Sequence, residues 1–207
     1  MKKITSFVLA VFITLFCFNF VLANNSQGPN LEVQEQRLNE KMQRIQERLE
    51  IKKEIFQEEE EELEGTEQEV ARNQNQVRLA VHSLLEMKEV VGGIGPQVSE
   101  IAKEFNNSVQ NTQKLELRIA NRNAFTRFFM GGDKEAAKEL KDQIEQNRNR
   151  IQELYKLREQ CDCQEEIQNM FQEQLQEMED EQDRLEELTK KENQSRGLFG
   201  WLFGWLW

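Results

Sequence analysis

The stretch "KMQRIQERLEIKKEIF", residues 41–56, decides the fold of this chain. Its apolar residues recur at intervals of three, four and seven positions, at Met42, Ile45, Leu49 and Phe56. Such intervals place side chains on one stripe of an α-helix, whereas a half-buried strand would alternate apolar and polar residues. The stretch therefore predicts an amphipathic helix that packs against another helix along this stripe.

The apolar stripe continues over residues 31–91, which contain no proline and a single glycine, Gly65. Every seventh residue in this range is apolar, at Met42, Leu49, Phe56, Leu63, Val70, Val77, Leu84 and Val91. A heptad repeat of this kind is typical of a coiled coil. It predicts one continuous helix over residues 31–91, roughly 90 Å long at about 1.5 Å per residue, with its N-terminal half projecting as a stalk.

A projecting amphipathic helix has to bury its apolar stripe, so we expect the stalk to associate with further copies of the chain. The predicted oligomer seam consists of Leu38, Met42, Ile45, Leu49, Phe56 and Leu63. The glutamate-rich residues 57–69 interrupt the second set of heptad positions. Because successive glutamates on a helix point in different directions, this segment predicts a solvated stretch of helix and not a calcium site.

Three further amphipathic stretches follow within residues 96–195, separated by clusters of turn residues. Glycines and Pro96 divide the first stretch from the long helix, Gly131 and Gly132 end it, and Asp133 is a favourable N-cap for the next helix. The sequence shows no strand-like alternation of useful length. We therefore predict an all-α fold, in which the helices of residues 96–195 pack as an antiparallel bundle with part of the long helix.

The N-terminus resembles an export signal. Lys2 and Lys3 precede a run of apolar residues, and "VLA", residues 21–23, supplies the small residues expected before a cleavage site. We predict a signal peptide over residues 1–23 and a short linker over residues 24–30. The alternative is an uncleaved membrane anchor, since about 20 apolar residues can span a bilayer. Either interpretation places the rest of the chain outside the cytoplasm, as an exported, cell-surface or membrane-associated protein.

The charge balance excludes whole classes of partner. The chain has 27 Lys and Arg against 38 Asp and Glu, and removal of residues 1–23 takes away two lysines, which changes the net charge from −11 to −13. Nucleic-acid binding needs a basic surface, and attraction to anionic lipid needs clustered cations. We therefore expect no nucleic acid as partner, and any membrane contact must depend on apolar and aromatic groups.

The segment "RGLFGWLFGWLW", residues 196–207, holds all three tryptophans of the chain. Its predicted membrane-interface residues are Leu198, Phe199, Trp201, Leu202, Phe203, Trp205, Leu206 and Trp207. As a helix, the eleven residues after Arg196 would reach roughly 16 Å, too short to span a bilayer. Tryptophan favours the membrane interface, where its ring and its N–H group are both accommodated. The alternatives are that this tail packs on the bundle, in an oligomer seam, or on a partner protein.

The glycine and aromatic composition of this tail resembles that of viral fusion peptides, and "GLFG", residues 197–200, matches the start of an influenza-type fusion peptide. The resemblance covers about a dozen residues, at the C-terminus of this chain. It implies bilayer affinity and not fusion.

A second apolar cluster lies in "NAFTRFFMGG", residues 123–132, with Phe125, Phe128, Phe129 and Met130. Three of these share one helical face, so the first expectation is a cap that packs on the bundle. The alternative is a second loop that contacts lipid or a partner. If it lies at the same end of the bundle as the tail, the two would form one hydrophobic foot.

Catalytic and metal chemistry find little support. Cys161 and Cys163 alone cannot complete a zinc site, which needs four ligands. The two cysteines could be free thiols, form an internal disulfide with each other, or cross-link two chains. The single histidine, His82, falls on the expected exposed face of the long helix. There is no nucleotide-binding glycine loop and no nucleophile with a plausible histidine partner. We predict no catalytic residues, no metal and no cofactor.

These features predict a non-enzymatic, exported coiled-coil protein that self-associates and is tethered to a membrane or envelope by its Trp-rich C-terminus, with an unidentified protein as a further possible partner. Two alternatives come from other classes. A pore-forming or membrane-remodelling protein would use the tail and residues 123–132 together. An extracytoplasmic holdase chaperone would bind unfolded clients between its helical arms.

Overall fold

The computed structural model describes residues 30–198, with side chains from Val33 onward, and confirms an all-helical chain over this range. The helices are α1 (Asn30–Glu61), α2 (Gly65–Met87), the short 3₁₀ helix η1 (Gly92–Ile94), α3 (Gly95–Ala120), α4 (Ala124–Met130), α5 (Lys134–Glu159) and α6 (Glu165–Gln194). The predicted signal peptide, all of the predicted linker but Asn30, and tail residues 199–207 lie outside the described residues.

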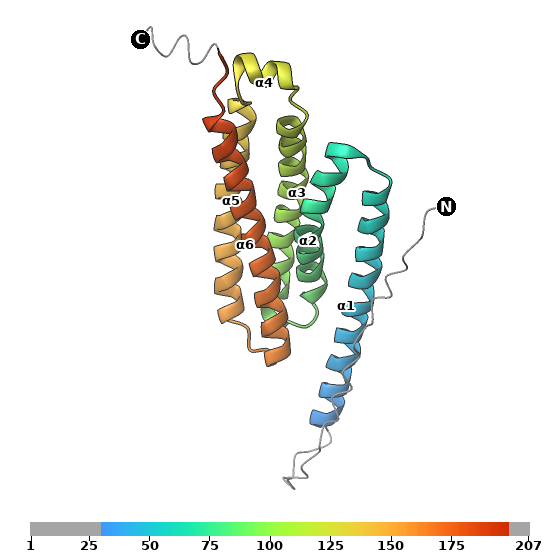
Figure 1. The fold of residues 1–207 in the computed structure, drawn as a ribbon. Helices are drawn as coiled ribbons and strands as arrows, with labels where there is room; N and C mark the ends of the chain where they lie inside the picture. The colour runs from blue at the N-terminus through green and yellow to red at the C-terminus, as the bar shows by residue number, and fades with distance from the viewer. Residues whose placement is uncertain (1–29, 199–207) are drawn as a thin grey trace, which may run out of the picture.

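Four of the helices, α2, α3, α5 and α6, lie side by side around a shared apolar core, and we call them the four-helix body. Each runs opposite to the helix that precedes it in the body, as Figure 1 shows. The helix α4 crosses one end of the body, between α3 and α5, and α6 finishes at this same end. The turn between α5 and α6 lies at the other end, together with η1.

The predicted continuous helix over residues 31–91 is wrong. The chain leaves the helix after Glu61 and re-enters it at Gly65, whose φ of 59° lies in the left-handed region that glycine adopts easily. As a result α1 folds back along α2, although its first turns extend past the end of α2 in Figure 1. A hairpin is favoured because each helix buries the apolar stripe of the other, which a single extended helix leaves in water.

The residues predicted to form an oligomer seam pack largely within the chain. Met42, Ile45 and Phe56 are buried, Leu38 and Leu49 are half-buried against the main core, and Leu63 is half-buried in the turn. Phe56 lies under the Arg78 guanidinium, 3.7 Å from the ring centroid, and beside His82. His82 is thus half-buried at the α1–α2 contact and not on a free face, and this burial lowers its pKa.

A layer of polar side chains divides the core into two apolar clusters. The larger cluster fills the body toward η1, and the smaller one, built around Ile119, Leu140 and Leu185, lies toward α4. Between them Arg184 donates to the Glu116 carboxylate at 2.6 and 2.7 Å and to that of Glu181 at 2.8 and 2.9 Å. These contacts fix the register of α3 against α6, since a slip would leave buried charges unpaired.

Candidate functional site

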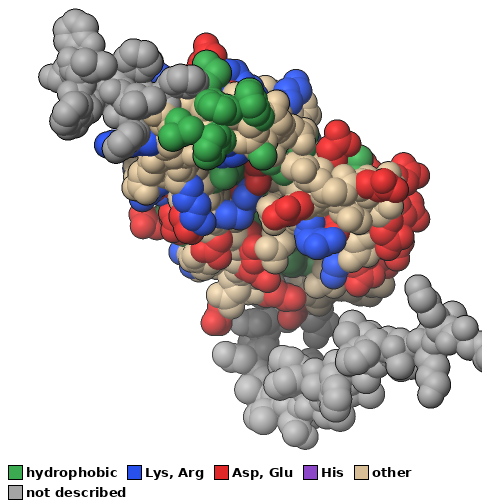
Figure 2. Space-filling model, turned by 45° about the horizontal axis from the view of Figure 1, so that its top comes forward, with side chains coloured by type: hydrophobic (Ala, Val, Ile, Leu, Met, Phe, Trp, Pro, Cys, Tyr) green, Lys and Arg blue, Asp and Glu red, His purple; other side chains and the backbone are tan. Residues whose placement is uncertain are grey.

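The helix α4 places an apolar patch on the surface at one end of the body. Its side chains Phe125, Phe128 and Met130 are 73%, 59% and 70% exposed, and Figure 2 shows apolar side chains gathered on this face. The half-buried Phe129 lies behind them, with ring centroids 4.5 Å from Phe125 and 5.0 Å from Phe128. Large apolar side chains clustered in water are typical of an interaction site and not of an ordinary surface.

Polar contacts attach α4 to the body. The Arg127 side chain donates from Nη1 to the Glu192 carboxylate of α6 and from Nη2 to the Ile119 carbonyl oxygen of α3, both at 2.6 Å. The second carboxylate oxygen of Glu192 accepts the Asp133 N–H, also at 2.6 Å. Since Glu192 is buried, these charge-assisted bonds hold α4 with Arg127 turned inward and its phenylalanines turned outward.

The root of the C-terminal tail is held against the end of α4 by direct backbone contact. The Gly132 N–H donates to the Ser195 carbonyl oxygen at 3.0 Å. A Cβ atom on Gly131 would collide with that same carbonyl oxygen, and one on Gly197 would collide with the backbone of Phe129 and Gly131. Only glycine allows the two segments to approach this closely. Leu198, 39% exposed, therefore leaves the body beside the apolar patch.

Arginines border the patch, but carboxylates engage them. Arg118 contacts Asp133 at 2.9 Å and Glu135 at 2.7 Å, and Arg122 lies 3.5 Å from Asp133. Asp133 also caps α5 by accepting the Ala136 N–H at 3.0 Å. Burial alone would disfavour its ionised form, but this N–H and the two arginines outweigh it and lower the pKa of Asp133.

The structure brings two of the predicted sites together and separates a third. The patch residues and Leu198 lie at one end of the body, whereas residues 199–207 of the predicted tail lie outside the described range. The first expectation for residues 123–132, a cap packed on the body, holds only for the half-buried Phe129. Cys161 and Cys163 form a disulfide with each other at the opposite end.

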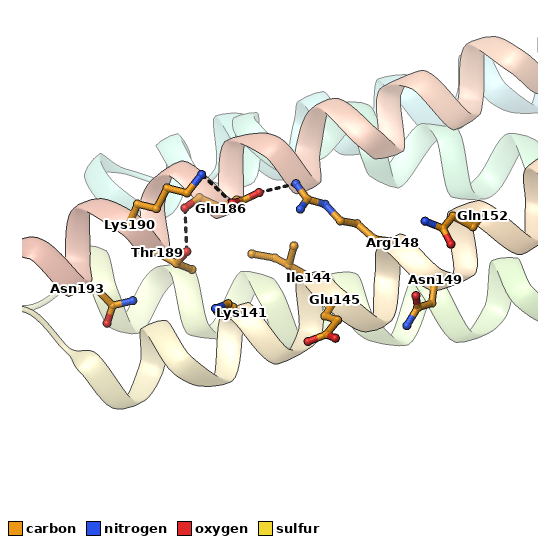
Figure 3. Close-up of a pocket in the computed structure, with 10 residues that line it drawn as sticks. All are labelled: Lys141, Ile144, Glu145, Arg148, Asn149, Gln152, Glu186, Thr189, Lys190 and Asn193. Carbon is orange, nitrogen blue, oxygen red and sulfur yellow. Dashed lines mark hydrogen bonds and ion pairs between the residues drawn. The ribbon is translucent and has the colours of Figure 1, made fainter.

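A shallow surface groove of about 420 Å³ runs between α5 and α6 (Figure 3). Three of its charged side chains are paired: Arg148 of α5 contacts Glu186 of α6 at 2.6 Å and the neighbouring Asp183 at 2.7 Å, and Lys190 contacts Glu186 within α6 at 2.7 Å. Paired charges on a solvated face are typical of helix packing, and the lining holds no nucleophile next to a base. Within residues 30–198 no three His, Cys, Asp or Glu side chains are grouped to hold a metal ion.

Sequence reasoning missed the two residues that orient the patch, Arg127 and Glu192. They lie 65 residues apart in the chain, so no local spacing connects them. A signal was present for one of them, because Arg127 is the single charge inside the apolar run "AFTRFFM", residues 124–130. A charge in such a run either faces solvent or has a buried partner, and here it has the partner.

Comparison with protein families, with curated proteins and with solved structures finds no match to this chain. Among the helices of the described range, none is both long enough and apolar enough to cross a membrane.

Proposed function

We propose that this chain is a non-enzymatic, exported helical protein that is tethered to a membrane by its α4 end. The observation that carries the proposal is the meeting of the exposed patch, Phe125, Phe128 and Met130, with the fixed root of a tail that holds every tryptophan of the chain. The patch and the tail would enter the same membrane interface, with the four-helix body standing above it.

The energetics support apolar attachment. Transfer of a phenylalanine side chain from water to an apolar environment is worth about 1.5–3 kcal/mol, so each ring of the patch that enters the interface would contribute on the order of 1 kcal/mol. Tryptophans of the tail would add to this, since they prefer the interfacial region. Attachment of this kind needs no cluster of cations, in agreement with the net charge of −11.

The dimensions support an interfacial tether and not a spanning anchor. The seven residues of α4 form a helix of roughly 10 Å, and the eleven residues after Arg196 would reach roughly 16 Å. Both are short of the approximately 30 Å of a hydrocarbon core. A passive tether is therefore favoured over the pore-forming alternative, and leakage of dye from vesicles at saturating protein would reverse this preference.

Export is proposed from the N-terminal residues 1–23, and the Cys161–Cys163 bond supports it because disulfides persist in oxidising compartments. Self-association is not required by this proposal. The apolar stripe that suggested an oligomeric coiled coil, including Met42, Ile45 and Phe56, is used in the α1–α2 hairpin of one chain.

Flotation with phosphatidylcholine vesicles tests the tether. Residues 24–207, which retain every described helix, are compared with the same chain ending at Arg196 and with a triple variant in which Phe125, Phe128 and Met130 are each replaced by Ser. We expect the longest chain to float, the truncated chain to remain at the bottom, and the triple variant to bind about ten-fold more weakly or worse.

The matched control replaces three apolar side chains that are exposed on α1, Val33, Ile51 and Ile55, by Ser. These are 45%, 56% and 37% exposed and belong to α1, outside both the patch and the tail, so their loss should leave flotation unchanged. If this control reduces flotation as much as the patch variant does, binding is unspecific. If residues 24–207 do not float at all, the tether is wrong.

A further inference from the structure

We infer that the α4 end selects zwitterionic over anionic membranes, because its arginines are already paired with carboxylates while an exposed acidic turn lies on the same side of the molecule. This inference rests on the proposed function and specifies its lipid class. Two features of the described residues support this inference. The first is that the arginines around the patch form ion pairs with carboxylates, and the second is the position of the acidic turn between α1 and α2.

The arginines around the patch have little charge to offer to a lipid phosphate. Arg118 is shared between Asp133, Glu135 and Glu139, and Arg127 is bound to the buried Glu192. The lysines at the end of α6 contact glutamates one turn earlier, Lys190 at 2.7 Å from Glu186 and Lys191 at 2.8 Å from Glu187. An anionic headgroup would have to displace these carboxylates, which would leave negative charge at the membrane surface.

Three cations near the patch, Lys134, Lys138 and Arg196, are exposed and have no carboxylate within ion-pair distance among residues 33–198. Their attraction to an anionic surface is worth about 1 kcal/mol each at most. Four carboxylates in the α1–α2 turn oppose them.

The α1–α2 turn brings exposed negative charge toward the α4 end. Because the helices alternate in direction, α1 ends and α2 begins on the side of the molecule that points toward α4, although the turn stops short of α4 in Figure 1. Glu58, Glu61, Glu62 and Glu64 are exposed there and form no ion pair or side-chain hydrogen bond with a described residue. Figure 2 shows acidic side chains on the same face as the apolar patch.

The consequence for lipid choice follows from the range of electrostatics. Charges interact over about 8 Å at physiological ionic strength and over about 30 Å at 0.01 M salt. At low salt, therefore, a turn on the α4 side of the body senses the charge of the surface on which the patch lands. A phosphatidylcholine surface has no net charge and leaves the apolar attraction of the patch unopposed. An anionic surface repels the four glutamates and the acidic body, and so weakens the same apolar contact.

The test is flotation of residues 24–207 with vesicles of phosphatidylcholine alone and of phosphatidylcholine mixed with phosphatidylserine, at low and at high salt. We expect a several-fold smaller bound fraction on the mixed vesicles at low salt, and little difference at high salt, where the repulsion is screened. A variant with Glu58, Glu61, Glu62 and Glu64 each replaced by Gln should recover most of the lost binding.

The matched control replaces four exposed glutamates in the half of the body remote from α4, Glu100, Glu153, Glu159 and Glu173, by Gln. It changes the net charge equally and should recover much less binding. Equal recovery by both variants would assign the effect to total charge and overturn the role of the turn. Equal or stronger binding to the mixed vesicles would overturn the lipid selection while leaving the tether intact. Absence of binding to both vesicles would instead reject the tether.

Discussion

At the end of the four-helix body that holds η1 and the Cys161–Cys163 disulfide, apolar side chains turn inward, whereas at the α4 end they turn outward. Val91, Leu157 and Cys161 belong to the buried core at the first end, and Cys161 Sγ lies 3.8 Å from the Val91 carbonyl oxygen. At the α4 end the phenylalanines face solvent while a charged side chain, Arg127, reaches inward to a buried carboxylate.

Both ends connect helices of the same four-helix body, so the difference does not follow from the need to close a bundle. The disulfide end shows that this chain can seal a connection with apolar residues in the usual way. At the α4 end Phe125 and Phe128 are exposed and do not belong to the buried core. Such an arrangement is typical of a surface that contacts another molecule, and for this reason we propose the α4 end as the functional end.

The largest expected effect on stability comes from replacing Arg127, the charged side chain that points into the body. Arg127→Met leaves the buried Glu192 carboxylate without its counter-charge, so the free energy of unfolding should fall by about 2–4 kcal/mol. The counterpart at the disulfide end is Arg158→Met, which removes one hydrogen bond of 3.2 Å to the Gln168 carbonyl oxygen. That loss should stay below about 1.5 kcal/mol. Urea unfolding measures both, and equal losses would contradict the structural difference between the ends.

The sequence predicts those parts of the fold that depend on residues close together along the chain. The helical class follows from the periods of three, four and seven. The α1–α2 turn was missed because Phe56 and Val70, on either side of it, are fourteen residues apart and so keep the heptad count through a reversal of the chain. Gly65 and the polar heptad position Glu59 were the local signals that the helix could end there.

The candidate site was predictable in its parts and not in its orientation. The composition of residues 123–132 and 196–207 marked both as apolar contacts, and the structure places α4 and Leu198 at one end. The outward orientation of Phe125 and Phe128 depends on the Arg127–Glu192 pair, which joins residues 65 positions apart. A single sequence contains no information on such a pairing until the helices are placed in space.

A smaller effect should follow from separating the tail root from α4. Gly197→Ala forces a Cβ atom against the backbone of Phe129 and Gly131, which should lower the free energy of unfolding by about 1–3 kcal/mol. The displaced root should also release the Gly132 N–H from Ser195, so its hydrogen exchange should accelerate by more than that of neighbouring amides.

Gly93 supplies the control at the opposite end. A Cβ atom there meets no atom within 4 Å, so Gly93→Ala should change the free energy of unfolding by less than about 1 kcal/mol and leave the exchange of the Gly132 N–H unaltered. If Gly197→Ala is equally harmless, the tail root is not held against α4, and the patch and the tail are independent surfaces.

The smallest expected effect on stability comes from the residues that precede α5 and α6, one at each end of the body. Asp133 caps α5 at the α4 end through its side chain, whereas Gln164 precedes α6 at the disulfide end without a side-chain cap. Asp133→Ala should therefore lower the free energy of unfolding by about 1 kcal/mol at neutral pH, and Gln164→Ala by less than about 0.5 kcal/mol.

The pH dependence of the Asp133 effect follows from its lowered pKa. Burial disfavours ionisation of the Asp133 carboxyl, but the Ala136 N–H and the adjacent Arg118 and Arg122 favour it more strongly, so its pKa in the folded chain lies below the unfolded value of about 3.9. The stabilisation is therefore complete above that unfolded value and is lost as the pH falls through the folded one.

Unfolding measured from pH 7 downward should show the wild-type chain and Asp133→Ala converging below about pH 4, because a protonated Asp133 no longer attracts the arginines. The small difference between the wild-type chain and Gln164→Ala should not change with pH, since no ionisable group is altered. A gap for Asp133→Ala that persists into acid would mean that Asp133 acts through packing or through the hydrogen bond that its neutral carboxyl still accepts from Ala136, and not through its charge.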